Sequence, residues 1–413
     1  MVVTLAILLA VNILNIYDRV ALAAVVEPIR REFHLSDAQV GAISTLFIVV
    51  YSVAGIPLGR MADRGSRRRL LAAGVAVWAA MTAATGLATS YLLLLLTRLG
   101  VGVGESVCAP TATSWIGDAV PAERRARALS IFMLATPIGS TLALAIGGPV
   151  AQALGWRAAL FAAALPALFL VPAVLWLKEP ARSGSKTGAP PSAWSLLKLP
   201  AFRWIIVSGA LLNFNLYVIS TFLPAFLTRY HGFSLARAGF WSGVTIGITG
   251  VLGGLVAGAI GDGIANSRPG GRMLAAAVAS AVSAPVLASA LLASPGSSVA
   301  LPLLGLGQGA LVMYYGLVYA AIQDIVAPER RGLAMSIYFL AMYLCGGAFG
   351  PLLTGRLSDW LAQRAVLEGA AAEAARAAGL HGALFLLPAI SLLLAIVLWA
   401  GARSMVRDRL KPA

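Results

Sequence analysis

The sequence has 413 residues, of which 59% are hydrophobic and only 11% are charged, and its mean hydropathy is +0.86. These values exclude a water-soluble globular protein and predict a chain surrounded by lipid. The formal net charge of +15 could indicate a nucleic-acid-binding protein. No nucleic-acid-binding module is found, however, and the basic residues follow the pattern that sets membrane topology.

Apolar stretches long enough to cross a bilayer recur along the chain. A spanning helix needs about 20 mostly apolar residues. Twelve such stretches are centred near residues 15, 48, 79, 105, 139, 167, 216, 249, 282, 311, 345 and 391. We therefore predict an all-α, multi-pass protein of a cell membrane, such as the bacterial inner membrane. The first stretch is expected to stay in the mature protein, since no basic residue precedes it and no A-x-A cleavage site follows it.

Two of these stretches contain charged residues. The first contains Asp18 and Arg19, and the fourth contains Arg98 and Glu105. Near the middle of a membrane each such residue costs roughly 2.5 to 3.5 kcal/mol. Arg98 and Glu105 are roughly 10 Å apart along a helix axis, so each is expected to find its partner on the first helix. We interpret these residues as functional, with a purely structural ion-pair cluster as the alternative.

Polar residues also follow one face of the first helix. Helical spacing places Asn12, Asn15 and Arg19 together and turns Asp18 about 100° away. We predict that Arg19 binds an anionic group, because a guanidinium presents a fork of donors to such groups, with Asn12 and Asn15 beside it. Asp18 and Glu105 are the acidic residues deep within predicted spans, and we predict that they carry a coupling proton together with Arg98. Burial favours the protonated carboxyl and a neighbouring arginine favours the carboxylate, so protonation can depend on conformation.

A second group of charged residues lies in the inner loops. Asp63 with Arg67, near Arg124 or Arg125, can form a network that closes the cytoplasmic side. We predict that these four residues form a cytoplasmic gate. The alternative is that they only anchor the topology, because solvated charges contribute little to stability.

One segment occurs twice in the sequence. Residues 121–131 read PAERRARALSI and residues 327–337 read APERRGLAMSI, 206 positions later, and Asp118 recurs as Asp324. We therefore predict two pseudo-symmetric bundles of six helices, residues 1–177 and 203–402. The Pro-, Ser-, Gly- and Lys-rich residues 178–202 between them are predicted to be a cytoplasmic linker, and residues 403–413 a cytoplasmic tail.

The distribution of basic residues fixes the predicted orientation. With both termini inside, the inner loops and tail carry 21 of the 31 Lys and Arg residues, the outer loops carry 8, and the other two are Arg19 and Arg98. This bias is the positive-inside rule. Both termini and the linker are therefore predicted to be cytoplasmic.

The second half offers polar and aromatic residues in place of charges. We predict that these residues shape the opposite wall of a substrate cavity, because aromatic side chains with a polar tip suit an amphipathic molecule. For the tyrosines, packing between helices is the alternative. The candidates are Asn213, Asn215, Gln308, Tyr314, Tyr315, Tyr338 and Tyr343.

Histidines and cysteines are few. His34, His231 and His381 fall in or near predicted outer loops, and Cys108 and Cys345 fall within predicted helices. We therefore expect no metal site, no disulfide and no bound cofactor.

Several motifs resemble those of a known family. The segment GRMADR (residues 59–64), followed by Arg67 and Arg68, resembles the major facilitator signature between helices 2 and 3, although glycine stands at position 65 rather than at Ser66. Arg98 with Gly102 and Gly104 resembles its helix 4 signature. Within that superfamily the first 180 residues look most like the Spinster group, through NIYDR (15–19), GVGE (102–105) and TPIGS (136–140).

The resemblance implies the major facilitator fold and a function. Spinster proteins are associated with sphingolipids and lysophospholipids, which implies an amphipathic, lipid-like substrate with an anionic head. We expect a monomeric secondary transporter that works by alternating access, driven by a gradient of protons or another cation. A proton-coupled symporter of a small organic anion and a drug/proton antiporter are the alternatives. An enzyme is not expected, because no nucleophile or cofactor constellation is found in the sequence.

Overall fold

The computed structural model describes residues 2–180, 196–265, 270–326 and 330–409, and these residues form helices without strands. Twelve helical stretches are long and apolar enough to cross a membrane, and each contains one of the predicted centres. This confirms the predicted all-α membrane fold. The contacts divide the chain into two compact units.

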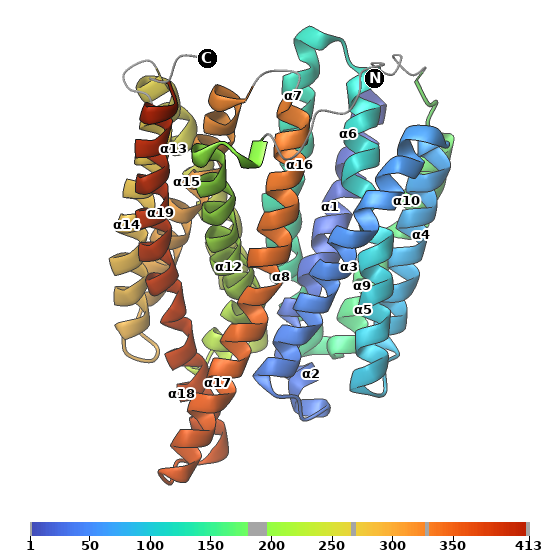
Figure 1. Ribbon diagram of the computed structural model, residues 1–413. Helices are drawn as coiled ribbons and strands as arrows, with labels where there is room; N and C mark the ends of the chain where they lie inside the picture. Colours follow the sequence, from blue (N-terminus) through green and yellow to red (C-terminus); the bar gives the residue numbers. More distant parts are fainter. Residues whose placement is uncertain (1, 181–195, 266–269, 327–329, 410–413) are drawn as a thin grey trace. The chain divides into compact units, whose positions relative to one another are not determined.

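Unit 1 comprises Met1–Thr187 together with Leu223–Thr228 and Phe233–Gly243. Several of its spans consist of two shorter helices joined at a break (Figure 1). The helices of the first 180 residues are α1 (Val2–Ala24), α2 (Val26–Glu32), α3 (Asp37–Arg64), α4 (Arg67–Gly86), α5 (Tyr91–Glu105), α6 (Cys108–Ala119), α7 (Ala122–Met133), α8 (Ala135–Leu154), α9 (Trp156–Ala164) and α10 (Ala167–Trp176).

The break in the fourth span lies next to a predicted site residue. Helix α5 ends at Glu105 and α6 begins at Cys108. The break between α9 and α10 has a different origin, because Pro166 lacks the N–H that would continue the helix.

Glycines allow the start of α13 (Leu235–Ala265) to pack closely on α8 within unit 1. A Cβ added to Gly239 would lie 2.5 Å from the carbonyl oxygen of Leu144, and one added to Gly148 would lie 2.7 Å from that of Leu235. Gly239 and Gly243 are spaced as in the small-xxx-small pattern of packed membrane helices. Unit 1 therefore includes residues beyond position 203, and the predicted boundaries of the halves remain predictions drawn from the repeat.

Unit 2 comprises Gly188–Phe222, Arg229–Gly232 and Val244–Ala413. One of its spans contains a π-helical segment, η2 (Met342–Gly347). A Cβ on Gly346 would overlap the carbonyl of Ala210, so η2 lies directly against α12. The remaining helices are α12 (Pro200–Arg229), α14 (Gly271–Leu292), α15 (Ala300–Ile325), α16 (Arg331–Ala341), α17 (Phe349–Leu367), α18 (Ala372–Leu384) and α19 (Leu386–Arg409).

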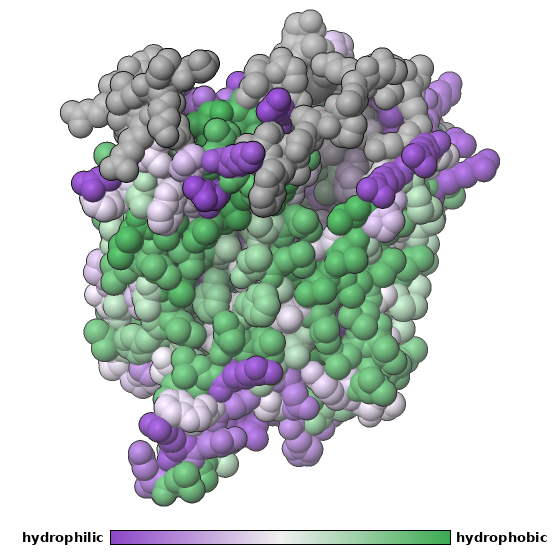
Figure 2. Space-filling view, viewed as in Figure 1, coloured by the Kyte–Doolittle hydropathy of each residue, from purple (hydrophilic) through white to green (hydrophobic). Residues whose placement is uncertain are grey.

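The surface pattern agrees with burial in lipid. Figure 2 shows hydrophobic residues covering the middle of the molecule's visible face and hydrophilic residues gathered towards its two ends. Large apolar side chains such as Leu168, Phe169 and Leu255 are more than two-thirds exposed. Such a surface would be unstable in water, whereas hydrocarbon solvates it.

Candidate functional site

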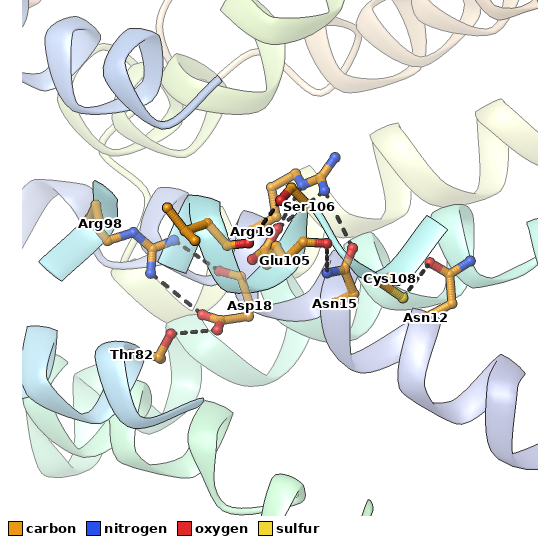
Figure 3. Close-up of polar contacts among 10 residues, drawn as sticks. Asn12, Asn15, Asp18, Arg19, Thr82, Arg98, Glu105, Ser106 and Cys108 are labelled. Carbon is orange, nitrogen blue, oxygen red and sulfur yellow. Dashed lines mark hydrogen bonds and ion pairs between the residues drawn. The ribbon is translucent and has the colours of Figure 1, made fainter. Parts of the chain in front are cut away.

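The four charged residues within the spans of unit 1 form two ion pairs between α1 and α5. Arg19 lies 3.1 Å from the Oε2 atom of Glu105, and Arg98 lies 3.5 Å from the Oδ1 atom of Asp18. This confirms the expectation that Arg98 and Glu105 each have a partner on the first helix. The pairs diverge as the helical spacing predicts, because adjacent residues Asp18 and Arg19 point in different directions (Figure 3).

Asp18 is enclosed by donors. The Nη1 atom of Arg98 donates to its Oδ1, the hydroxyl of Thr82 donates to its Oδ2, and the Nη2 atom of Arg98 donates to its backbone carbonyl at 3.2 Å (Figure 3). The Asp18 and Arg98 side chains are 1% and 3% exposed. These contacts join α1, α4 and α5 and satisfy both oxygens of the carboxylate.

Arg19 lies at the edge of the network. Its Nε donates to Glu105 at 3.1 Å and its Nη2 donates to the Oδ1 atom of Asn15 at 3.3 Å. The guanidinium also lies over the rings of Tyr51 and Phe47, 4.3 Å and 5.6 Å from their centroids, which is a cation–π arrangement. Its side chain is 13% exposed whereas that of Glu105 is fully buried, so Arg19 is the member of this pair that a ligand can reach.

Glu105 uses only one of its carboxylate oxygens. Oε2 accepts from Arg19, whereas the buried Oε1 has no hydrogen-bond partner among the described residues. The Nδ2 atom of Asn15 donates to the backbone carbonyl of Glu105 at 3.4 Å, where α5 ends. An unpartnered buried oxygen is costly for a carboxylate, and a bound proton would lower that cost.

Asn12 lies further along α1, next to the same break. Its Nδ2 donates to the carbonyl of Phe132 on α7 at 3.1 Å, and its Oδ1 lies 4.0 Å from the sulfur of Cys108 on α6. The structure therefore shows Asn12 linking three helices. Its predicted contact with substrate remains a prediction.

The predicted gate residues lie at the end of α3 (Asp63), at the start of α4 (Arg67) and in the first turn of α7 (Arg124 and Arg125). Arg67 forms an ion pair with Asp118 at 2.5 Å, a partner that the sequence analysis did not propose. Arg124 is exposed. The side chains of Asp63 and Arg125 lie outside the described residues. An Arg67–Asp63 contact therefore remains untested.

Glu179 caps the first turn of α4 beside this pair. Its carboxylate accepts from the backbone N–H of Arg67 and from the hydroxyl of Ser66, both at 3.0 Å, and from the N–H of Arg68 at 3.5 Å. Partial burial alone would raise the pKa of Glu179, but these hydrogen bonds together with the Arg67 charge hold the pKa below its usual value. The carboxylate therefore stabilises the start of α4. Glu179 was not singled out from the sequence.

Unit 2 contains an ion pair that corresponds to the Arg67–Asp118 pair of unit 1. Asp324, the counterpart of Asp118, accepts from Arg272 at 2.7 Å. Arg272 is the second residue of α14, as Arg67 is the first residue of α4. The internal repeat therefore extends from the sequence to a specific contact.

The predicted tyrosines of unit 2 form a connected aromatic cluster. The hydroxyl of Tyr338 donates to that of Tyr314 at 3.1 Å, and Tyr314 lies 2.7 Å from the hydroxyl of Ser208. The ring of Tyr315 contacts that of Tyr319, and Tyr319 contacts Tyr338. These contacts join α12, α15 and α16, consistent with a role of the buried tyrosines in packing.

Of the other predicted residues of unit 2, Asn213 lies beside the tyrosine cluster, since its side chain hydrogen-bonds with that of Tyr315. Asn215 donates to the carbonyl of Leu387 and to Ser391 on α19, and Asn213 donates to its own helix at Gly209. Tyr343 packs edge-on against Tyr217. Gln308 is buried, and its Oε1 has no hydrogen-bond partner among the described residues. The structure therefore brings Asn213 together with the predicted tyrosines and places Asn215 against α19.

Comparison with known proteins identifies the family. The protein-family model described as Major Facilitator Superfamily matches residues 8–351. The chain belongs to the major facilitator superfamily. It is 32% identical to an MFS-type efflux pump of Mycolicibacterium smegmatis, over 98% of this chain and 94% of that one. It is also 31% identical to Protein spinster homolog 1 of Mus musculus, over 85% of this chain and 72% of that one.

A solved structure supports the same assignment. The crystal structure of a bacterial homolog of the human lysosomal transporter Spinster, in an inward-facing and unoccupied conformation, matches with a TM-score of 0.88 and 26% identity. The match covers 99% of this chain and 98% of that one. The chain is thus a Spinster-like, multi-pass secondary transporter rather than an enzyme, as the sequence motifs predicted.

Proposed function

We propose that this major facilitator protein transports an amphipathic, lipid-like molecule with an anionic head and couples that transport to protons. The observation that carries the proposal is the Arg19–Glu105 pair. It combines a partly exposed guanidinium with a fully buried carboxylate that has one unpartnered oxygen. In such a pair the arginine can exchange Glu105 for an anionic ligand, and Glu105 can then bind a proton.

The exchange follows from the contacts of Arg19. An anionic head that takes the guanidinium leaves Glu105 buried without a counter-charge, and a buried carboxylate without a counter-charge binds a proton. The rings of Tyr51 and Phe47 beside the guanidinium offer apolar surface to the rest of an amphipathic molecule. Substrate and proton are thereby linked through one arginine.

The Asp18–Arg98 pair supports coupling in a second way. Because it is enclosed next to the first pair, a change in the charge of Glu105 alters the field at Asp18. We assign Asp18, Glu105 and Arg98 to proton coupling, and Arg19 with Asn12 and Asn15 to substrate binding. Asp63, Arg67, Arg124 and Arg125 are assigned to closure of the cytoplasmic side.

A drug/proton antiporter is the second candidate, because the chain is 32% identical over most of its length to a protein named an efflux pump. A symporter of a small organic anion has less support. Such a substrate requires several basic groups, and the buried polar residues described in unit 2 include no lysine or arginine.

A substrate screen in proteoliposomes tests the proposal. The panel contains an anionic lysophospholipid, a cationic amphipathic dye and a sugar acid, each measured with and without a pH gradient. We expect gradient-dependent movement of the lysophospholipid. Movement of the dye alone would establish the antiporter, and movement of the sugar acid alone would refute the amphipathic substrate.

A further inference from the structure

A pocket of about 550 Å³ opens at the turn between α3 and α4 of unit 1. Three arginines line it, Arg60 and Arg64 on α3 and Arg69 on α4, together with Met61 and Leu70. The positive-inside rule assigns this end of the helices to the cytoplasm. The pocket is distinct from the Arg19–Glu105 pair, and none of the residues that line it is assigned to substrate binding, proton coupling or the gate.

The turn around the pocket carries an excess of positive charge, since residues 60–70 contain five arginines and one aspartate. Arg60, Arg64 and Arg69 are exposed, and none of them forms an ion pair with a described carboxylate. Two acids that contact this turn are already engaged, since Asp118 pairs with Arg67 and Glu179 caps α4. Three arginines around one cavity therefore leave an electropositive site.

The pocket lies at the ends of two candidate membrane-spanning helices. Helix α3 ends at Arg64 and α4 begins at Arg67. Arg60, Met61 and Arg64 thus lie in the last two turns of α3. Met61 is 53% exposed and Leu70 is half-buried, so the lining of the pocket also offers apolar surface.

We propose that this pocket binds the phosphate group of an anionic phospholipid from the cytoplasmic leaflet. Guanidinium groups bind phosphate oxygens through paired N–H donors. Arg60 and Arg64 are one helical turn apart and can approach the phosphate from α3, while Arg69 approaches it from α4. Met61 and Leu70 contact the glycerol and the first methylene groups.

Native mass spectrometry of the purified protein in detergent tests the proposal. The protein is incubated with phosphatidylglycerol and phosphatidylcholine at equal mole fractions. The variant Arg60→Gln/Arg64→Gln/Arg69→Gln is compared with a control that loses the same charge elsewhere on the predicted cytoplasmic side, Arg127→Gln/Lys178→Gln/Lys198→Gln. All three control side chains are exposed.

The unmodified protein and the control should retain phosphatidylglycerol roughly tenfold better than phosphatidylcholine, and the pocket variant should lose that preference. Equal retention by both triple variants would overturn the proposal. If the pocket variant does not fold, Arg64→Gln and Arg69→Gln are measured singly, and each should weaken retention several-fold. Unchanged retention in both single variants would also overturn the proposal.

Inorganic phosphate distinguishes the source of the ligand. At concentrations equal to that of the lipid, it should not displace phosphatidylglycerol, because it lacks the apolar part that contacts Met61 and Leu70. Displacement at equal concentration would mean that the site binds a free anion and would overturn the lipid assignment. This readout involves no transport, so its failure is distinguishable from failure of the proposed function.

Discussion

Arg19 is the residue whose chemistry is most specific to the candidate site. Its Nε and Nη2 atoms contact Glu105 and Asn15 at the same time, which a lysine ammonium cannot reproduce with the same geometry. We expect Arg19→Lys to weaken substrate binding roughly tenfold and Arg19→Ala more strongly. Equilibrium binding to folded protein in detergent, with Arg237→Lys at the exposed start of α13 as a control, measures this. Equal affinity in Arg19→Ala and the parent would remove Arg19 from the site.

The two buried carboxylates carry a separate prediction. Asp18→Asn and Glu105→Gln keep the size of each side chain but cannot exchange a proton. We expect Asp18→Asn to abolish pH-gradient-driven transport while substrate binding or exchange persists, and Glu105→Gln to cause a similar loss. Accumulation in proteoliposomes is measured against Glu373→Gln, whose carboxyl is exposed at the start of α18. If both variants still accumulated substrate, the carboxylates would only be structural partners of the arginines.

At the scale of single residues, the sequence predicted the ion pairs between α1 and α5 but not the other side chains that contact them. Helical periodicity and the cost of unpaired charge were sufficient to predict that α1 supplies the partners of Arg98 and Glu105. Thr82 and Tyr51 were not predicted, because each is one polar or aromatic residue in a long apolar helix, without periodic signal. Asp118 was identified as a repeated residue but not as the partner of Arg67, since that contact depends on how α4 and α6 pack.

The packing of α13 on α8 depends on glycine at specific positions. An alanine at position 239 would bring its Cβ to 2.5 Å from a backbone carbonyl, so one helix must move. The strain should exceed the normal benefit of alanine in a helix and destabilise unit 1 by about 1–3 kcal/mol. The matched control is Gly250→Ala on the same helix, where an added Cβ meets nothing within 4 Å. Unfolding in detergent should show Gly239→Ala to be less stable than Gly250→Ala. Equal stability would show that α8 and α13 can move apart at no cost in free energy.

The ends of α12, α14 and α18 carry a pH-sensitive contact in unit 2. The Nδ1 atom of His231 accepts from the N–H of Gly296 at 3.1 Å, and the ring of Tyr230 stacks on that of His381. Burial, and secondarily the charge of His381, lowers the pKa of His231. The unfolded chain therefore binds a proton at a higher pH than the folded protein does, and the free energy of unfolding should fall as the pH drops below about 6.5.

Replacing the imidazole of His231 tests whether it causes the predicted fall in stability at low pH. His231→Gln should flatten the decline in stability between about pH 7 and pH 5, whereas His34→Asn should retain it, since His34 is exposed and adopts a positive φ that asparagine tolerates. Thermal unfolding in detergent at several pH values provides the measurement. The same slope in His231→Gln and the parent would assign the decline to other groups.

Most element boundaries followed from apolar length and from charged or Pro- and Gly-containing interruptions, and all twelve spans were located. The internal breaks were not predicted. The α5–α6 break and the π-helical η2 lie inside predicted spans, where composition does not distinguish a regular helix from an interrupted one. Their positions depend on neighbouring helices. Asn15 on α1 donates to the last residue of α5, and Ala210 on α12 contacts η2.

For the molecule as a whole, the segment that recurs 206 positions later predicted two similar bundles of helices. The structure shows a corresponding ion pair in each unit. The two pairs differ in environment. The side chains of Arg67 and Asp118 are 4% and 12% exposed, whereas those of Arg272 and Asp324 are 20% and 36% exposed. Sequence alone could not distinguish them, because the residue types are identical and burial depends on the surrounding helices.

This difference predicts unequal consequences of the same substitution. Asp118→Asn removes the ion-pair partner of the buried Arg67, and loss of one partner of a buried pair costs about 3–5 kcal/mol. Asp324→Asn leaves Arg272 able to reach water, where such pairs contribute about 0–1 kcal/mol. Unfolding of each variant in detergent, with a double-mutant cycle that adds Arg67→Gln or Arg272→Gln, isolates the two coupling energies. A coupling energy for Arg272–Asp324 as large as that for Arg67–Asp118 would show that burial does not set the strength of these pairs.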